Sequence, residues 1–396
     1  MAKKKSTTEK AVKKAYKSNP KAFIISVVAI VLVIAIAAAV LYFAFPDTWD
    51  TIVDIVAGNS DKTNNDEFSA LTRGEGELLV HMLDVGQGDC IYVQFPDGKD
   101  MVIDCANYND AGAYWTETLA YLNTYITDKT IEYLMLTHCD SDHVYFMDEL
   151  IEEFQIEKLF MPNVLAAPGT KSDTKKALQE QIDALDTSLF TDPDTIDSIT
   201  YAEFFIAALT EPNCEIVLNM DKDDSTNSII IEEETYRLVF YCATEEDYAS
   251  KKFNLNSAES KNAISPIGIL EYNGKKIMLT GDSNEINEPL VMERTGKIDC
   301  DVLKVGHHGS ETSTLNNFLD CYTFEYAIIS CNASGNKFEH PRQATLDRLA
   351  SHNIEVYRTD NNGNIIVSVD KDGKITITTE KSATQQTNLI GADTAK

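Results

Sequence analysis

Short apolar runs alternate with polar turns along most of the chain beyond residue 77. The pattern predicts strands at 79–83, 90–95, 101–104, 131–136 and 158–161, and helices at 113–126 and 147–154. The rhythm returns later, with strands at 264–272, 276–280, 300–305, 326–330 and 355–358, helices at 285–294, 314–319 and 342–352, and a closing hairpin at 364–369 and 374–379. Strands that alternate with helices in this way predict a layered α/β domain.

A different pattern occupies residues 22–45, which carry no charge and are rich in Ile, Val, Ala and Leu. As a helix this stretch is about 36 Å long at ~1.5 Å per residue, enough to cross a bilayer with some tilt. A cleaved signal peptide is the alternative, but its apolar core is usually about 7–15 residues long. We therefore expect a single retained transmembrane helix.

Charge sets the expected orientation of this helix. The segment 1–21 holds eight lysines and one glutamate, whereas Asp47, Asp50 and Asp54 follow the apolar stretch. The positive-inside rule then predicts a single-pass protein of the cell membrane, with a cytoplasmic N-terminus and the rest outside the cytoplasm. The whole chain has a net charge of −29, so the part beyond the helix is strongly acidic. Such a surface repels anionic polymers at long range, which argues against a broad nucleic-acid groove.

These patterns predict a series of segments. A basic tail covers 1–21, the transmembrane helix 22–45, a polar linker 46–76, the folded domain 77–380, and a polar tail 381–396. Within the domain, the pattern loosens and becomes acidic at about 169–260, which we interpret as an insertion or lid. That segment still predicts a helix at 174–185 and a hairpin across 229–241.

Eight cysteines are dispersed without a CxxC pair. An even number outside the membrane permits disulfides. Most of them lie in apolar runs, where cysteine behaves as a small core residue, so buried free thiols are favoured.

The segment 137–143 concentrates four potential metal ligands within six residues, directly after a predicted buried strand: His138, Asp140, Asp142 and His143. Imidazole together with carboxylate suits zinc, iron or manganese rather than calcium. The alternative is a polar turn in which Asp142 starts the next helix.

Other potential ligands also follow predicted strands. Asp282 comes just after 277–279, and His307 and His308 follow 300–305 with glycines on either side. Three further carboxylates lie at strand ends early in the domain: Asp84, Asp89 and Asp104. Each is weak evidence alone, because strand-end aspartates are often turn or cap residues. Together they predict a site where several strands end.

The order of these motifs resembles the metallo-β-lactamase fold, and within it the hydrolase domain of the ComEC DNA-internalisation family. The resemblance rests on Asp84-Val85-Gly86-Gln87-Gly88-Asp89, the segment 137–143, Leu279-Thr280-Gly281-Asp282 and His307-His308-Gly309-Ser310. The segments 335–341 and 357–363 also resemble the end of that domain. The match covers about 77–380 without the segment 169–260. Because the pattern predicts one transmembrane helix and not the permease helices of ComEC, we do not expect DNA transport to carry over.

The resemblance implies a four-layer αββα sandwich with two divalent metal ions, zinc or manganese, at one edge. His138 and Asp140 would hold the first ion, Asp142 and His143 the second, and Asp282 would bridge them. His307 or His308 would complete the second position. The third histidine of the fold, expected before the Asp282 strand, has no counterpart near 262–265.

Roles for the remaining residues follow from this implied site. Two divalent ions ~3.5–4 Å apart lower the pKa of a bridging water toward ~7, so that hydroxide is available at neutral pH. Asp142 is the candidate catalytic residue, as a ligand that also orients the hydroxide. Asp84, Asp89 and Asp104 are candidates for holding ligand histidines in the right tautomer, with loop bracing as the alternative. Asn336 and His340 are candidates for binding substrate.

The resulting hypothesis is a membrane-anchored, extracytoplasmic metal-dependent hydrolase, a phosphodiesterase that uses a metal-bound hydroxide. Its substrate would be a phosphodiester, such as DNA or a cell-wall polymer, and no obligate protein partner is inferred. The alternative is a degenerate, non-catalytic binding or scaffold protein of the same fold.

Overall fold

The computed structural model describes residues 73–107, 113–190, 193–221, 229–249, 255, 257–333 and 337–394. The chain divides into two compact units, Met1–Glu67 and Phe68–Lys396, and every described residue belongs to the second. The predicted transmembrane segment, residues 22–45, lies outside the described residues. Within them, we find no helix that combines the length and the apolar character needed to cross a membrane.

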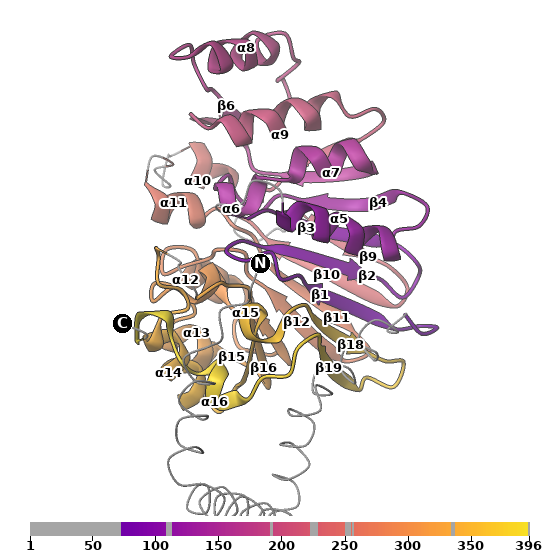
Figure 1. The fold of residues 1–396 in the computed structure, drawn as a ribbon, viewed down its shortest axis with the longest axis vertical. Coiled ribbons are helices and arrows are strands. Elements are labelled where there is room, and N and C mark those ends of the chain that lie inside the picture. Colours follow the sequence, from indigo (N-terminus) through magenta and orange to yellow (C-terminus); the bar gives the residue numbers. More distant parts are fainter. Residues whose placement is uncertain are drawn as a thin grey trace, which may run out of the picture. The chain divides into compact units, whose positions relative to one another are not determined.

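The second unit is built on two mixed sheets (Figure 1). The first sheet has eight strands, in the spatial order β19 (Ile375–Thr379), β18 (Ile365–Val369), β1 (Leu78–Met82), β2 (Cys90–Gln94), β3 (Asp100–Cys105), β4 (Thr130–Met135), β5 (Gln155–Met161) and β8 (Glu215–Leu218). The second has seven, in the order β17 (Glu355–Arg358), β16 (Tyr326–Ile329), β14 (Val302–Lys304), β12 (Lys275–Leu279), β11 (Ile267–Tyr272), β10 (Tyr236–Tyr241) and β9 (Ile229–Glu232).

Alternating side chains along these strands separate the core into layers. In β1, Leu78, Val80 and Met82 join an apolar cluster that also contains Leu270 and Leu279 of the second sheet. This cluster fills the space between the sheets, because period-two alternation sends every second side chain to the same face.

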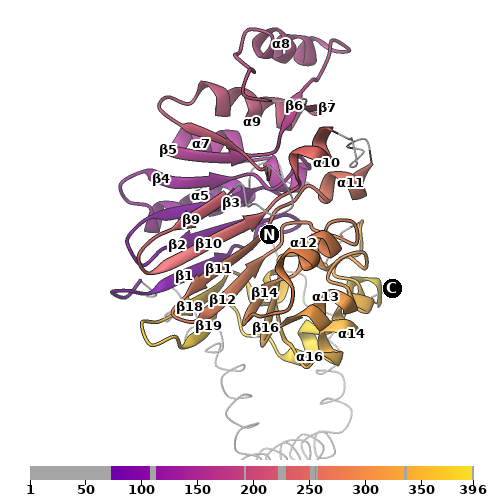
Figure 2. The ribbon, with the colours of Figure 1, turned by 180° about the vertical axis from the view of Figure 1, so that it is seen from behind.

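The outer face of each sheet is covered by helices (Figures 1 and 2). Against the first sheet pack α5 (Ala113–Tyr125), α7 (Met147–Glu153) and α9 (Ile199–Thr210). Against the second pack α12 (Glu288–Thr295), α13 (Asn316–Cys321) and α14 (Gln343–Ser351). The result is an αββα sandwich, which confirms the predicted α/β fold class.

The segment 169–260 is not a separate insertion throughout. It contains α8 (Asp173–Ile182) and α9, but it also supplies β8 to the edge of the first sheet and the β9–β10 hairpin to the second. The small strands β6 (Val164–Ala166) and β7 (Asp194–Ile196) pair with each other beside these helices. The predicted helix at 174–185 and hairpin across 229–241 correspond to α8 and to β9–β10, whereas α9 and β8 were not predicted.

The tail beyond residue 380 is ordered against the edge of the second sheet. The short helix α16 (Gln385–Asn388) places Gln385 against β17, where its side chain accepts from the Val356 N–H at 2.9 Å and donates to the Val356 carbonyl at 2.7 Å. Arg358 of β17 donates to the Ile390 carbonyl at 2.6 Å. The tail therefore satisfies backbone groups that an edge strand leaves open. The 3-10 turn η2 (Ala392–Thr394) ends the described chain.

All eight cysteines are free thiols, and six of them are buried. The sulfurs of Cys90 and Cys105 lie 3.6 Å apart across β2 and β3.

Candidate metal centre

The candidate ligands gather where strands of both sheets end. Strands β3 and β4 run parallel in the first sheet, and β12 and β14 run parallel in the second, so their carboxyl ends meet at one edge. The short helix α6 (Ser141–Val144) follows β4, Asp282 follows β12, and the turn η1 (Gly306–Gly309) follows β14. The three motifs, far apart in sequence, therefore reach the same place.

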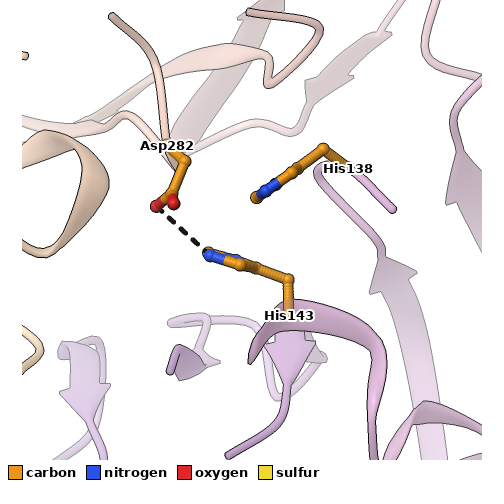
Figure 3. A group of neighbouring side chains, drawn as sticks. All are labelled: His138, His143 and Asp282. Atoms are coloured by element: carbon orange, nitrogen blue, oxygen red, sulfur yellow. Dashed lines mark ion pairs between the residues drawn. The ribbon is translucent and has the colours of Figure 1, made fainter. Parts of the chain in front are cut away.

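Four donor atoms converge at the centre of this edge. His143 Nε2 lies 3.2 Å from Asp282 Oδ1, a contact drawn in Figure 3. His308 Nε2 lies 3.6 Å from the same Asp282 oxygen and 3.6 Å from Asp142 Oδ2. Ligands bonded tetrahedrally to one zinc ion at ~2.0–2.1 Å are roughly 3.3 Å apart. These three separations are thus close to those between ligands of a single ion.

Three of these four atoms show a second feature that is typical of a cation site. Among the described residues, His143 Nε2, His308 Nε2 and Asp282 Oδ1 are buried and make no hydrogen bond. Buried polar atoms are normally satisfied, and such an exception calls for an explanation. A divalent ion satisfies all three at once, so these residues fit the metal that the fold implies.

The opposite ring nitrogen of each histidine is anchored. His143 Nδ1 lies 2.7 Å from Asp104 Oδ2, and His308 Nδ1 lies 2.9 Å from the Ser330 carbonyl oxygen. The Ser330 carbonyl oxygen can only accept, and Asp104 accepts when it is ionised, so in each neutral ring Nδ1–H donates and the lone pair of Nε2 faces the centre. A partner that fixes the tautomer in this way orients a metal-binding imidazole.

His138 also faces the centre (Figure 3). Its Nδ1 lies 3.1 Å from Thr137 Oγ1 and 3.2 Å from Ser265 Oγ. Its remaining nitrogen groups with His143 and Asp282 as a potential ligand set.

The three early carboxylates have different surroundings. Asp104 receives the Thr137 N–H and hydroxyl, each at 2.7 Å, as well as the His143 ring. Asp89 is fully buried and lies 2.5 Å from Lys304 Nζ and 3.5 Å from His308 Nδ1. Asp84 instead accepts from the Gly86 N–H and lies 3.4 Å from Lys381 Nζ, so it braces the loop.

The loop that carries Asp89 requires glycine at position 88. A Cβ at this position would collide with the carbonyl oxygens of Ala106 and Asp142. The Asp89 N–H donates to the Asp142 carbonyl at 3.1 Å, so the close approach ties the loop to the ligand segment.

The electrostatics of the cluster favour a positive charge at its centre. Burial disfavours charge on His143, but Asp282 and Asp104 outweigh burial and raise the pKa of His143 well above its usual value. Burial likewise opposes ionisation of Asp282, yet His143 and His308 hold the pKa of Asp282 well below its usual value. By contrast, burial lowers the pKa of His138 well below normal. The carboxylates therefore attract a proton to His143, which a metal ion would displace.

The turn η1 separates the roles of its two histidines. His307 and His308 both have left-handed backbones, with φ of 49° and 52°. His308 is fully buried and points to the donor cluster, whereas 23% of the His307 side chain is exposed. His307 Nε2 lies 3.7 Å from Asp282 Oδ2. The geometry thus gives the second metal position to His308.

The first metal position is less complete. Asp140 Oδ2 lies 4.0 Å from His138 Nε2, but Asp140 Oδ1 is ion-paired with Lys261 Nζ. Lys261 belongs to α11 (Ala258–Asn262), just before β11. The neighbouring Asn262 contacts the His307 ring at 3.1 and 3.2 Å. The carboxylate expected beside His138 is therefore held by Lys261, and His138 adds a single donor to the His143 and Asp282 atoms with which it groups.

A cavity of about 280 Å³ opens onto these groups. Asp140, Asp142, Lys261 and His307 line it. His340 also lines it, with its ring centroid 5.1 Å from that of His307, and burial lowers the pKa of His340 to about 3. The other candidate for substrate binding, Asn336, lies outside the described residues.

Two lysines of this region have no counterpart in the sequence predictions. Lys304 is fully buried and also donates to the Gly281 carbonyl at 3.0 Å. A charged residue inside the apolar run 302–305 is a visible signal of a buried ion pair. Lys261 offers no such signal, because lysine on a short polar helix is usually solvated.

Comparison with known proteins identifies the class. Residues 83–208 match the family model described as the metallo-beta-lactamase superfamily. The αββα sandwich and its edge site agree with this match, so the chain has a metallo-β-lactamase fold like that of metal-dependent hydrolases.

The particular branch follows from relatives. The chain is 27% identical over 303 residues to ComE operon protein 3 of Bacillus subtilis, an alignment that covers 74% of this chain and 33% of that protein. It is 35% identical over 101 residues to competence protein ComA of Neisseria gonorrhoeae, covering 25% of this chain and 14% of that protein. The chain spans about a third of ComE operon protein 3. These similarities support the resemblance to a ComEC-type hydrolase domain seen in the sequence.

Among solved structures, the metallo-beta-lactamase fold protein YhfI from Bacillus subtilis aligns with a TM-score of 0.40 and 8% identity. That alignment covers 76% of this chain and 99% of YhfI.

Proposed function

We propose that the protein is a metal-dependent phosphodiesterase whose divalent ion, zinc or manganese, is held by Asp142, His143, Asp282 and His308. The observation that carries the proposal is the convergence of Asp142 Oδ2, His143 Nε2, Asp282 Oδ1 and His308 Nε2, whose recorded separations are 3.2–3.6 Å. A divalent ion at such a position acidifies water and polarises a phosphoryl oxygen.

The chain's own residues have distinct tasks in this proposal. Asp104 and the Ser330 carbonyl keep the Nδ1 protons of His143 and His308, so that both rings present a lone pair. Asp142 lines the cavity and is 15% exposed, so one of its oxygens can orient water. His340 and Phe338 also line the cavity and would bound the substrate.

Phosphodiesters are the proposed substrate class. The name of one relative, competence protein ComA, refers to competence, which favours nucleic-acid phosphodiesters over cell-wall polymers. The acidic chain argues for a short contact at the site rather than a long groove. We further propose that residues 22–45 anchor the protein in the cell membrane, with the hydrolase domain outside the cytoplasm.

The test uses the full-length protein, stripped of metal and then supplied with manganese or zinc. Cleavage of bis-p-nitrophenyl phosphate is expected with metal and is expected to vanish in Asp142→Ala, while the circular dichroism spectrum is unchanged. Absence of cleavage, together with absence of tightly bound metal, would favour the non-catalytic scaffold instead. Parallel assays with single-stranded DNA and a choline-bearing cell-wall polymer then separate the two substrate sources.

A further inference from the structure

The positively charged side chain of Lys261 lies at the first metal position. Asp140 is the only carboxylate of segment 137–143 other than Asp142, and its Oδ1 is paired with the Lys261 ammonium. Both side chains are 22% exposed, so the pair is largely withdrawn from water. A divalent ion bound to Asp140 would lie next to this ammonium, and the repulsion between them is strong in a site shielded from solvent.

The residues before β11 supply no replacement ligand. Asn262 is buried against the His307 ring. Ser265 lies 3.2 Å from His138 Nδ1 and accepts from the Asp282 N–H at 3.2 Å. These side chains brace the site, and neither brings an imidazole or a carboxylate to the side of Asp140.

A lysine also lies near the second metal position, but it has a different partner from Lys261. Lys304 Nζ lies 4.0 Å from Asp282 Oδ1, but it is held at 2.5 Å by Asp89. Asp89 is a carboxylate additional to the four donors that converge there. Lys304 therefore forms its ion pair with a carboxylate outside this set of donors, whereas Lys261 forms its ion pair with the candidate ligand Asp140.

Lys261 also faces the place where substrate would bind. It lines the 280 Å³ cavity together with Asp140, Asp142 and Asp282. We propose that the site is a one-metal centre in which the Lys261 ammonium takes the place of the first ion and binds an anionic phosphoryl oxygen of the substrate. This inference rests on the proposed function and departs from the two ions that the sequence resemblance implies.

Metal stoichiometry of the full-length protein tests the first half of the inference. After saturation with zinc and removal of free metal, mass spectrometric metal analysis should give one ion per chain. Lys261→Glu replaces the ammonium with a ligand carboxylate and should raise the value to two. Lys275→Glu is the matched control and should stay at one, since Lys275 forms a comparable half-buried pair with Asp301 at 2.7 Å, at the opposite end of β12.

The outcomes separate this inference from the proposed function. Two ions in the wild-type protein would overturn the one-metal centre and leave the hydrolase proposal standing. No bound ion in the wild-type protein would overturn both. One ion in both the wild-type and the Lys261→Glu proteins would show that Lys261 does not keep the second ion out. The wild-type measurement decides the main point even where the variant does not fold.

Inorganic phosphate is the probe for the second half. Binding of phosphate to the zinc-loaded protein, measured by calorimetry, should weaken at least tenfold in Lys261→Gln and stay unchanged in Lys275→Gln. Equal phosphate affinity in the wild-type and Lys261→Gln proteins would overturn the anion-binding role.

Discussion

In the proposed site, one short segment offers ligands to two neighbouring metal positions, but the rest of the fold completes only one of them. Asp142 and His143 meet His308 and Asp282, whose free atoms turn toward the same point. Asp140, two residues before Asp142, meets Lys261 instead, 121 residues further along the chain. The comparison shows that the spacing of a motif identifies candidate metal ligands. Which of these candidates can bind a metal ion depends on the residues that the fold places next to them.

The two positions also differ in how firmly they are held. His143 and His308 are fully buried, with Nδ1 anchored to a carboxylate and a backbone carbonyl. The Asp140 and Lys261 side chains are each 22% exposed at the wall of the cavity. A preorganised set of donors loses less entropy on binding, which favours the position of His308 for tight metal binding.

The largest expected effect separates the two adjacent histidines. His308→Ala removes a ligand, and its loss of zinc affinity should exceed the ~10–100-fold typical of an outer partner. His307→Ala should reduce affinity less than tenfold, since His307 faces the cavity. Competition with a chelator on the full-length proteins measures both values. Equal losses of zinc affinity would mean that both histidines bind metal, and His307 could then not be assigned a role apart from that of His308.

The support beneath His143 gives the next test. Asp104→Asn keeps the shape of the side chain but removes the charge that accepts the His143 Nδ1 proton at 2.7 Å. Zinc affinity should fall by roughly 10–100-fold. Asp84→Asn is the matched control, because Asp84 braces a loop beside Lys381. Similar losses in the two variants would contradict the division of roles among the early carboxylates.

Most of the fold was predictable because the strands alternate regularly and glycine-bearing turns separate them. The predicted hairpin at 364–369 and 374–379 corresponds to β18 and β19 within one residue. The helix α9 was missed because Tyr201, Phe204 and Phe205 lie among further apolar residues, without a clear polar face. The strand β8 was missed because a single short edge strand carries little periodicity.

The site was predictable in its ligand candidates but not in its partners. Strand-end positions alone nominated Asp282 and the two histidines of η1. The choice between His307 and His308 depends on left-handed backbone angles that flanking glycines suggest but do not determine. The pairing of Lys261 with Asp140 depends on how α11 packs, and the local sequence pattern does not predict that packing.

A smaller effect concerns the base of the His308 turn. The Glu288 carboxylate accepts from the Thr314 N–H at 2.6 Å and the Leu315 N–H at 3.4 Å, just beyond η1. Burial raises the pKa of Glu288 from 4.5 to about 7. Because the folded-state pKa is raised, the stabilising contribution is complete below pH 4.5 and is lost as the pH rises through about 7.

Between pH 5 and pH 7 this loss corresponds to about 2 kcal/mol in the free energy of unfolding. Urea unfolding of the metal-free, full-length protein should show this decline relative to Glu288→Gln, which does not titrate. Parallel pH profiles in the two proteins would mean that the turn beneath the second position does not depend on Glu288.

The smallest expected effect, that of Asp140→Asn, is the most direct challenge to the comparison. Asp140→Asn and Asp142→Asn make the same chemical change two residues apart. Asp142→Asn should weaken zinc binding by more than about a hundredfold, because it removes the charge of one of four converging donors. Asp140→Asn should change zinc affinity less than threefold, because the Asp140 carboxylate already balances the Lys261 ammonium. Chelator competition on the full-length variants measures both. A large loss of zinc in Asp140→Asn would show that Asp140 ligates metal despite its lysine, and the two positions would then be alike.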